Sequence, residues 1–211
     1  AFDTFPSGTT TSIPTHCVSG GGCRGNHMFV PLLAYLEQGS FEEQYDYNWE
    51  WGWCGWQRDH PDLKKTVISM YLCPSQSDWS EFPYRKDYFP VTGGRELYHE
   101  GRYGHVYIDG LFGINRWIKI DHINDGSSQT LAIGENAHPS RWGLGPGYDD
   151  PNVGGPAGWW MAADSGNKDD LPTNCSQARA HLNTENSINS EIFPIEREEN
   201  NDIPFGSQHP G

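Results

Sequence analysis

The sequence predicts an α+β domain in which a small antiparallel sheet and one main helix are surrounded by extensive loops. The 25 glycines and 15 prolines among 211 residues favour irregular backbone over a large part of the chain. Residues 28–45 carry apolar side chains at helical spacing, and several shorter stretches have the apolar character of strands. The length suits a single domain over residues 1–211, within which 137–204 forms a loop-rich insertion.

The helical pattern begins at Met28 and is amphipathic. Pro31 is tolerated there because it falls in the first turn. Gly39 is expected to interrupt the helix, and Ser40 is expected to cap a second short helix over 41–45. The apolar face consists of Phe29, Leu32, Leu33 and Leu36.

Strands are predicted on both sides of a turn-rich region, 74–102. The strongest strand signal in the first half is 66–72, which ends at Cys73-Pro74 because proline cannot continue a ladder. Residues 103–114 are expected to form a pair of short strands, with Asp109-Gly110 as the hairpin turn.

The central stretch is predicted to be a strand, a tight polar turn and a second strand. Apolar and polar residues alternate over 117–122, and 130–133 is a short apolar run that predicts a buried strand. Between them, Asn124-Asp125-Gly126 supplies a residue tolerant of positive φ. We expect 67–72 and 117–133 to form one sheet, against which the helix 29–38 packs.

Four segments resemble the motifs of one family. Residues 123–135 read I-N-D-G-S-S-Q-T-L-A-I-G-E, 29–38 read F-V-P-L-L-A-Y-L-E-Q, 71–75 read Y-L-C-P-S, and 205–211 read F-G-S-Q-H-P-G. In this order they resemble the planctomycete secreted proteins of domain-of-unknown-function family 1559, which are similar to oversized type II secretion pseudopilins. The family's older name is extracellular solute-binding family 10.

The resemblance implies a pseudopilin-like fold and a non-enzymatic structural or assembly role outside the cell, at the cell surface or in the periplasm. The implied partners are other copies or other pilin-like or cell-surface proteins. The family's long N-terminal helix and closing C-terminal hairpin are absent from this sequence, so membrane contact is expected only through that helix. We therefore expect Ala1 not to be the translated N-terminus, and the sheet to be covered by a partner, a further helix or the Trp-rich loop.

The formal net charge of −14 argues against nucleic acid and anionic membranes as partners and favours cations. Calcium is the candidate ion, because it prefers carboxylate and carbonyl oxygens. The candidate ligands are Asp149, Asp150 and Asn152, with a second acidic run over 164–170. The alternative is that both runs are solvated acidic loops.

The five cysteines favour an oxidising compartment. We expect disulfides between Cys17 and Cys23 and between Cys54 and Cys73, which leaves Cys175 over. Zinc bound by Cys17, Cys23 and the neighbouring histidines His16 and His27 is the less favoured interpretation, because this spacing fits no familiar finger.

Clustered tryptophans offer either a second small core or flat faces that stack on sugar rings. The second interpretation makes the protein an extracellular polysaccharide- or solute-binding protein. The candidate ligand-binding residues are Trp49, Trp51, Trp53, Trp56, Trp159 and Trp160.

The motif residues themselves are expected to be structural. Asp125 should cap amides of the turn that contains Gly126, and Glu135 should be a partly buried carboxylate bonded to backbone. Cys73 and Pro74 complete this structural set. No H-E-x-x-H or G-x-S-x-G pattern occurs in the chain, which favours a non-enzymatic protein. The enzyme alternative is a carboxylate glycosidase.

Overall fold

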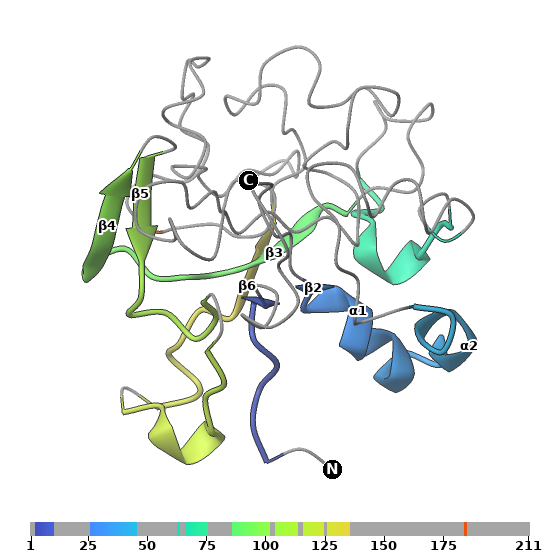
Figure 1. The fold of residues 1–211 in the computed structure, drawn as a ribbon, viewed down its shortest axis with the longest axis horizontal. Coiled ribbons are helices and arrows are strands. Elements are labelled where there is room, and N and C mark those ends of the chain that lie inside the picture. Colours follow the sequence, from blue (N-terminus) through green and yellow to red (C-terminus); the bar gives the residue numbers. More distant parts are fainter. Residues whose placement is uncertain are drawn as a thin grey trace, which may run out of the picture.

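The structure is a computed structural model, and it describes residues 3–10, 26–45, 63, 66–75, 86–101, 104–113, 116–124, 126–135 and 184. Within these residues, short helices lie beside three two-stranded antiparallel sheets (Figure 1). The α+β class predicted from the sequence is therefore confirmed. The single sheet that we expected is wrong, because the strands pair in three separate ladders.

The predicted helical region is confirmed, but it divides into three short pieces: α1 (Phe29–Leu32), the 3-10 helix η1 (Leu33–Tyr35) and α2 (Gly39–Glu42). The break occurs at Glu37, whose φ is +59°. Leu33 O accepts the amides of both Leu36 and Gln38, at 3.1 and 3.0 Å, which is the hydrogen bonding of a left-handed helix end. The expected break at Gly39 and cap at Ser40 are wrong, because both residues lie inside α2.

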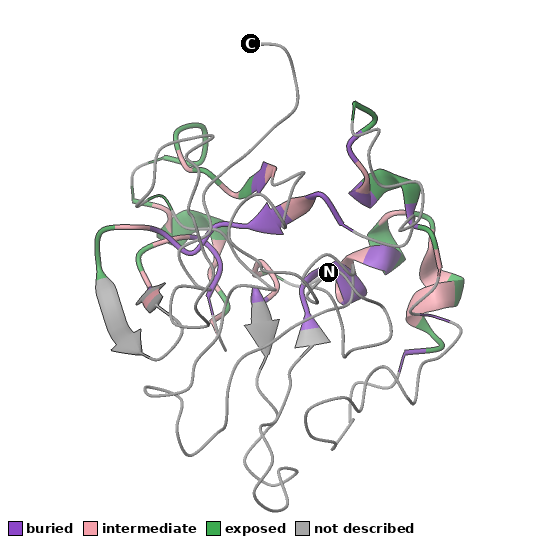
Figure 2. Cartoon of the chain, turned by 90° about the horizontal axis from the view of Figure 1, so that it is seen from above, coloured by how far each residue is buried: buried purple, intermediate pink, exposed green. Residues whose placement is uncertain are grey.

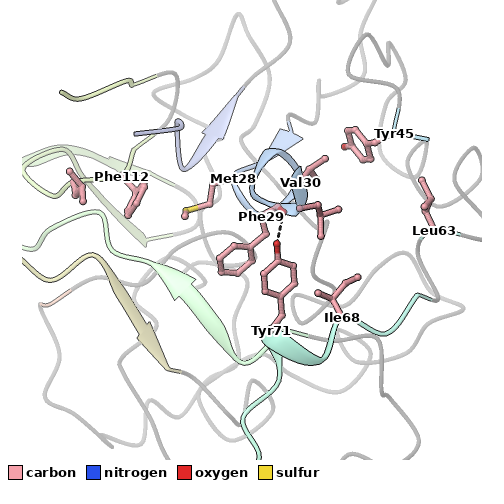
Figure 3. Close-up of a cluster of buried hydrophobic side chains, with 10 residues drawn as sticks. Met28, Phe29, Val30, Tyr45, Leu63, Ile68, Tyr71 and Phe112 are labelled. Carbon is pink, nitrogen blue, oxygen red and sulfur yellow. Dashed lines mark hydrogen bonds between the residues drawn. The ribbon is translucent and has the colours of Figure 1, made fainter. Parts of the chain in front are cut away.

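The core is built around α1 and contains aromatic and aliphatic side chains from distant parts of the chain (Figure 3). The rings of Phe29 and Tyr71 stack with their centroids 4.5 Å apart, and Tyr71 Oη donates a 2.6 Å hydrogen bond to Phe29 O. Its buried members are Met28, Phe29, Val30, Leu33, Tyr45, Leu63, Ile68, Tyr71, Leu111 and Phe112. All four apolar residues predicted on the helix face take part, with Leu32 and Leu36 partly buried.

The strand predicted over 66–72 is wrong, because Ser69–Tyr71 forms a 3-10 helix, η3. Ile68 and Tyr71 are buried three residues apart, whereas Val67 and Met70 are exposed. Three-residue spacing is the period of a 3-10 turn, and a run of strand-forming residues concealed it in the sequence.

The strand that contacts this region comes from 74–102, which we expected to be mostly turns. β3 (Tyr88–Pro90) pairs antiparallel with β6 (Ile133–Glu135), and Val91 N–H extends the ladder to Ala132 O at 3.0 Å. Phe89, Pro90 and Val91 are buried in succession. The strand therefore lacks the two-residue alternation that reveals a strand with one exposed face.

Residues 116–124 and 126–131 form a lobe on one side of the fold, in which Ile118 and Ile123 pack against the core while other side chains face solvent (Figure 1). The strand expected over 117–122 is replaced by extended backbone and a 3-10 helix, η4 (Ile120–His122), and Phe5 N–H bonds Ile118 O at 2.8 Å. The buried strand expected over 130–133 is also wrong, because β6 begins at Ile133 and Leu131 is exposed. We call 116–124 and 126–131 together the projecting lobe, whose described residues are all exposed or half-buried. Figure 2 colours the described part of the chain by burial.

The third sheet is a hairpin of β4 (Leu97–Gly101) and β5 (Gly104–Tyr107), which pair through Gly101 and Gly104. The strand pair expected within 103–114 is wrong, because the partner of Gly104–Tyr107 precedes it in the chain. Asp109 and Gly110 are consequently no hairpin turn: Gly110 N–H donates to Thr92 O at 2.7 Å, joining the two segments side by side.

The N-terminal arm, residues 3–10, runs between the core and the projecting lobe. Its end, β1 (Thr9–Thr10), pairs with β2 (Asn26–His27), so the extended arm predicted from the sequence is held by a short ladder. The buried Ser7 hydroxyl donates to Gly113 O at 2.9 Å and accepts Arg116 N–H at 3.1 Å.

Gly110→Ala is expected to destabilise the protein by about 3 kcal/mol, as overpacking at a rigid site does. A Cβ at Gly110 would overlap the carbonyl carbon of Thr92, and neither backbone segment can move apart without losing the hydrogen bond between them. Urea denaturation measures the change.

Gly39→Ala is the matched control, because a Cβ there meets nothing within 4 Å and alanine favours the helix α2. We expect it to stabilise the protein by about 0.5–1 kcal/mol. Equal effects of the two substitutions would contradict the close approach at Gly110.

Candidate functional site

Two motifs separated by about sixty residues meet beside β3. The Y-L-C-P-S motif leads out of η3 to Cys73, whereas the G-E end of the central motif forms β6. The β3–β6 register places Tyr88 opposite Glu135. Cys73, Asp87, Tyr88 and Glu135 thus come together, and we call them the Cys73 cluster.

Backbone bonding fastens the cluster on one side. Cys73 N–H donates to Asp87 Oδ2 at 2.7 Å, and Asp87 N–H donates to Tyr71 O at 2.8 Å. Asp87 is fully buried, so its carboxylate depends on such donors in place of water. The two hydrogen bonds hold residues 71–73 alongside the start of β3.

The thiol of Cys73 is buried, with 2% of the residue exposed, and it is hydrogen-bonded to Glu135. Burial first, and then the hydrogen bond to Glu135, raise the pKa of the Cys73 thiol. Burial, followed by the nearby charges of Cys73 and Glu135, also raises the pKa of Tyr88. Reactive cysteines have lowered pKa values, so this environment favours a structural thiol over a nucleophile.

Lys86 adds a positive charge next to the cluster. It is fully buried, and its Nζ lies 5.1 Å from the centroid of the Phe89 ring, in cation–π contact. Sequence reasoning missed Lys86, Asp87 and Tyr88 because it assigned their region to turns. The apolar run from Tyr88 to Val91 was the signal that could have identified them.

A second polar site surrounds Asp109. Its carboxylate accepts the amides of Gly94, Arg95 and Glu96 at 3.1–3.3 Å. Burial raises the pKa of Asp109, but these backbone donors outweigh it, so the net pKa is lowered. The Asp109 carboxylate is thus the anion that these three backbone amides bind, in an arrangement known as an amide nest.

Thr184 attaches a distant part of the chain to the same loop. Its amide and its hydroxyl both donate to Gly93 O, at 2.7 and 3.1 Å. Gly93 has a φ of +115°, which only glycine adopts readily. Thr184 belongs to the predicted insertion 137–204, whose other residues lie outside the described part of the chain.

The structure brings together two of the predicted motif residues, Cys73 and Glu135. Glu135 is partly buried as expected, and it is hydrogen-bonded to the Cys73 thiol; the bonding of its carboxylate to backbone amides stays a prediction. Pro74 is exposed next to the cluster, whereas Gly126 lies apart in the projecting lobe with the expected positive φ, +86°. Asp125 lies outside the described residues.

Cys73 is a thiol in this structure, which differs from the disulfide expected between Cys54 and Cys73. Its thiol is instead hydrogen-bonded to Glu135 in a buried position. The other residues of the cysteine, tryptophan and calcium predictions lie outside the described ranges: Cys17, Cys23, Cys54, Trp49, Trp51, Trp53, Trp56, Trp159, Trp160, Asp149, Asp150 and Asn152.

Metal-binding geometry does not occur in the part of the chain that the structure describes, where no three His, Cys, Asp or Glu side chains converge on one point. His27, a member of the zinc alternative, uses Nδ1 to accept Phe29 N–H at 3.2 Å. The helices formed by the described residues are all too short or too polar to cross a bilayer.

Comparison with known proteins yields one family. The family model described as "Protein of unknown function (DUF1559)" matches residues 1–211. No curated protein and no solved structure matches the chain.

The raised pKa values of Cys73 and Tyr88 predict that alkaline solution destabilises the protein. A group whose pKa is raised in the folded state makes its full contribution to stability below its ordinary pKa, which is 9.0 for Cys73 and 10.0 for Tyr88. This contribution is lost as the pH rises above that value. Urea midpoints measured from pH 7.5 to 10.5 should therefore fall steadily above pH 9.

Cys73→Ser should flatten this loss above pH 9, because a serine hydroxyl does not ionise there. Tyr35→Phe is the control, since Tyr35 is exposed and should leave the profile unchanged. The same alkaline slope in wild type and Cys73→Ser would exclude the thiol as its source.

Proposed function

The chain belongs to the DUF1559 family of proteins of unknown function, and on that premise we propose that it is a non-enzymatic extracellular or cell-surface protein with a pilin- or pseudopilin-like assembly role. The family's older name, extracellular solute-binding, supports the location outside the cell. A pseudopilin-like fold belongs to the same proposal.

The observation that carries the proposal is that the side chains of the Cys73 cluster are engaged in structural hydrogen bonds. Cys73 and Glu135, the motif residues with the most reactive side chains, are bonded to each other in a buried site. The Cys73 amide is bonded to Asp87 in the same place. A nucleophile or general base needs access to a substrate and a pKa near the working pH. The cluster's chemistry instead favours holding β3, β6 and η3 together.

The projecting lobe supplies a surface for assembly. It exposes Trp117, Ile120 and Leu131, of which 55%, 61% and 59% are accessible to solvent. Asp121 and His122, also exposed, accompany these apolar side chains. Apolar and aromatic side chains among polar ones are typical of protein interfaces. We propose that this lobe contacts other copies of the chain, or other pilin-like or cell-surface proteins.

The second candidate function is binding of an extracellular solute or polysaccharide, which the family's older name favours. The tryptophans that would carry it, among them Trp49, Trp53 and Trp159, lie outside the described residues. Calcium bound near Asp149 and Asp150 would fit either role, because it orders acidic loops.

The test compares two surfaces that both expose apolar side chains. We expect the wild-type protein to associate at high concentration in sedimentation velocity, and to form ordered assemblies under electron microscopy. The triple variant Trp117→Ser, Ile120→Ser, Leu131→Ser should lose this association while keeping its circular dichroism spectrum. These side chains are exposed, so their replacement removes little from the core.

The matched control is Val67→Ser with Met70→Ser, which removes exposed apolar side chains in and just before η3. It should associate like the wild type. Association that survives in the lobe variant would contradict the proposed surface. A strictly monomeric wild type that binds a glycan array, and loses that binding on Trp49→Ala or Trp53→Ala, would favour the second candidate.

A further inference from the structure

The N-terminal arm is attached to the rest of the fold largely through its backbone. Its end, β1, pairs with β2, and beside this ladder Met28 N–H donates to Gly8 O at 3.0 Å. Nearer its start, Phe5 N–H donates to Ile118 O at 2.8 Å. The arm runs as one extended segment, so these bonds are spread along its length (Figure 1). A second segment of the same sequence would make the same bonds.

Side chains of the arm add specific contacts to this backbone bonding. The buried hydroxyl of Ser7 donates to Gly113 O at 2.9 Å and accepts Arg116 N–H at 3.1 Å. The half-buried ring of Phe5 meets Phe112 edge-on, with ring centroids 6.1 Å apart. An arm that leaves would deprive these backbone groups of their partners, so the vacated site favours a replacement of the same sequence. We call the residues that receive the arm the arm site: 26–28, 112–113 and 116–119.

The arm site borders the exposed apolar surface of the projecting lobe. Arg116, Ile118 and Lys119 contact the arm. Trp117 and Ile120, which are interspersed among them along the chain, are exposed. A second copy that contacts these two side chains would therefore lie next to the arm and to the site that holds it.

The segment between the arm and β2 is long enough for the arm to reach another molecule. Residues 11–25 join the two strands of the β1–β2 ladder. A segment of this length spans at most about 50 Å, which is three times the radius of gyration of about 17 Å expected for a compact chain of 211 residues. The chain connection therefore permits the arm to occupy either its own site or that of a neighbour.

We propose that the arm exchanges between copies, so that residues 3–10 of one copy occupy the arm site of a second copy. The closed and the exchanged forms contain the same contacts, so the balance between them depends on the connecting segment and on the local concentration of arms. This inference rests on the proposed assembly role, in which the projecting lobe brings copies together and so raises that concentration. Exchange then fastens the copies to each other.

Coupling by a water-soluble carbodiimide tests the exchange, because this reagent joins a carboxylate to an amine that it already contacts. Asp3 Oδ2 lies 2.8 Å from Lys119 Nζ in an exposed ion pair, so the wild-type chain carries its own reporter of arm and site. Chains labelled with ¹⁴N and with ¹⁵N are mixed in equal amounts, concentrated until they associate, coupled and digested. Mass spectrometry then identifies the isotopes in the linked peptides that contain Asp3 and Lys119.

Exchange predicts linked peptides in which one half carries ¹⁴N and the other ¹⁵N, and at full exchange this mixed form is the most abundant. Lys119→Arg is the matched control: it keeps the positive charge, but its guanidinium forms no stable amide, so this linked peptide should disappear. Linked peptides of a single isotope only, from chains that do associate, would overturn the exchange and leave the assembly role standing.

The lobe variant Trp117→Ser, Ile120→Ser, Leu131→Ser separates the two proposals further. It should lose the mixed-isotope peptide together with association, while the single-isotope peptide of the closed arm persists. Mixed-isotope peptides that remain in this variant would support exchange and contradict the lobe as the surface that brings copies together. A wild type that stays monomeric and yields only single-isotope peptides would contradict both proposals.

Discussion

The hydrogen bond from the Cys73 amide to the buried Asp87 carboxylate is the constraint on which the rest of the structure depends. It fixes the end of η3 against the start of β3, and so determines which residues β3 can offer to β6. The same contact positions Tyr71, whose hydroxyl and ring hold α1 through Phe29. One buried carboxylate therefore connects the core helix to the β3–β6 ladder, and the Cys73 amide donates to it in place of water.

The predictions that succeeded rest on local chemistry. The apolar face of 29–36 and the positive φ of Gly126 follow from side-chain spacing and from glycine's freedom. The strand predictions failed where neighbours decide the outcome. Residues 66–72 have strand propensity but lack a partner ladder, whereas β3 is buried in succession and carries no alternation. Register and pairing are tertiary properties, and a short strand shows little of either in its sequence.

Of the four residues in the candidate site, only Cys73 and Glu135 could be identified from the sequence, and their pairing could not. Cys73 and Glu135 were identified as structural motif residues, yet no spacing rule relates positions 73 and 135. Their meeting depends on η3 and β6 converging on β3, and the buried Lys86 and Asp87 became recognisable only there. Motif residues far apart in a chain are thus recognised as members of one site only when the third segment that lies between them is known.

The hydroxyl of Ser7 bonds to residues 106 and 109 positions further along the chain. Such separations give a high contact order, which slows folding because a long loop must close before the contact repays its entropy. During synthesis or export the arm emerges long before Gly113 and Arg116, so its binding site there is completed only later. In that interval the hydroxyl of Ser7 and the backbone of the arm lack these native neighbours and are available to other partners.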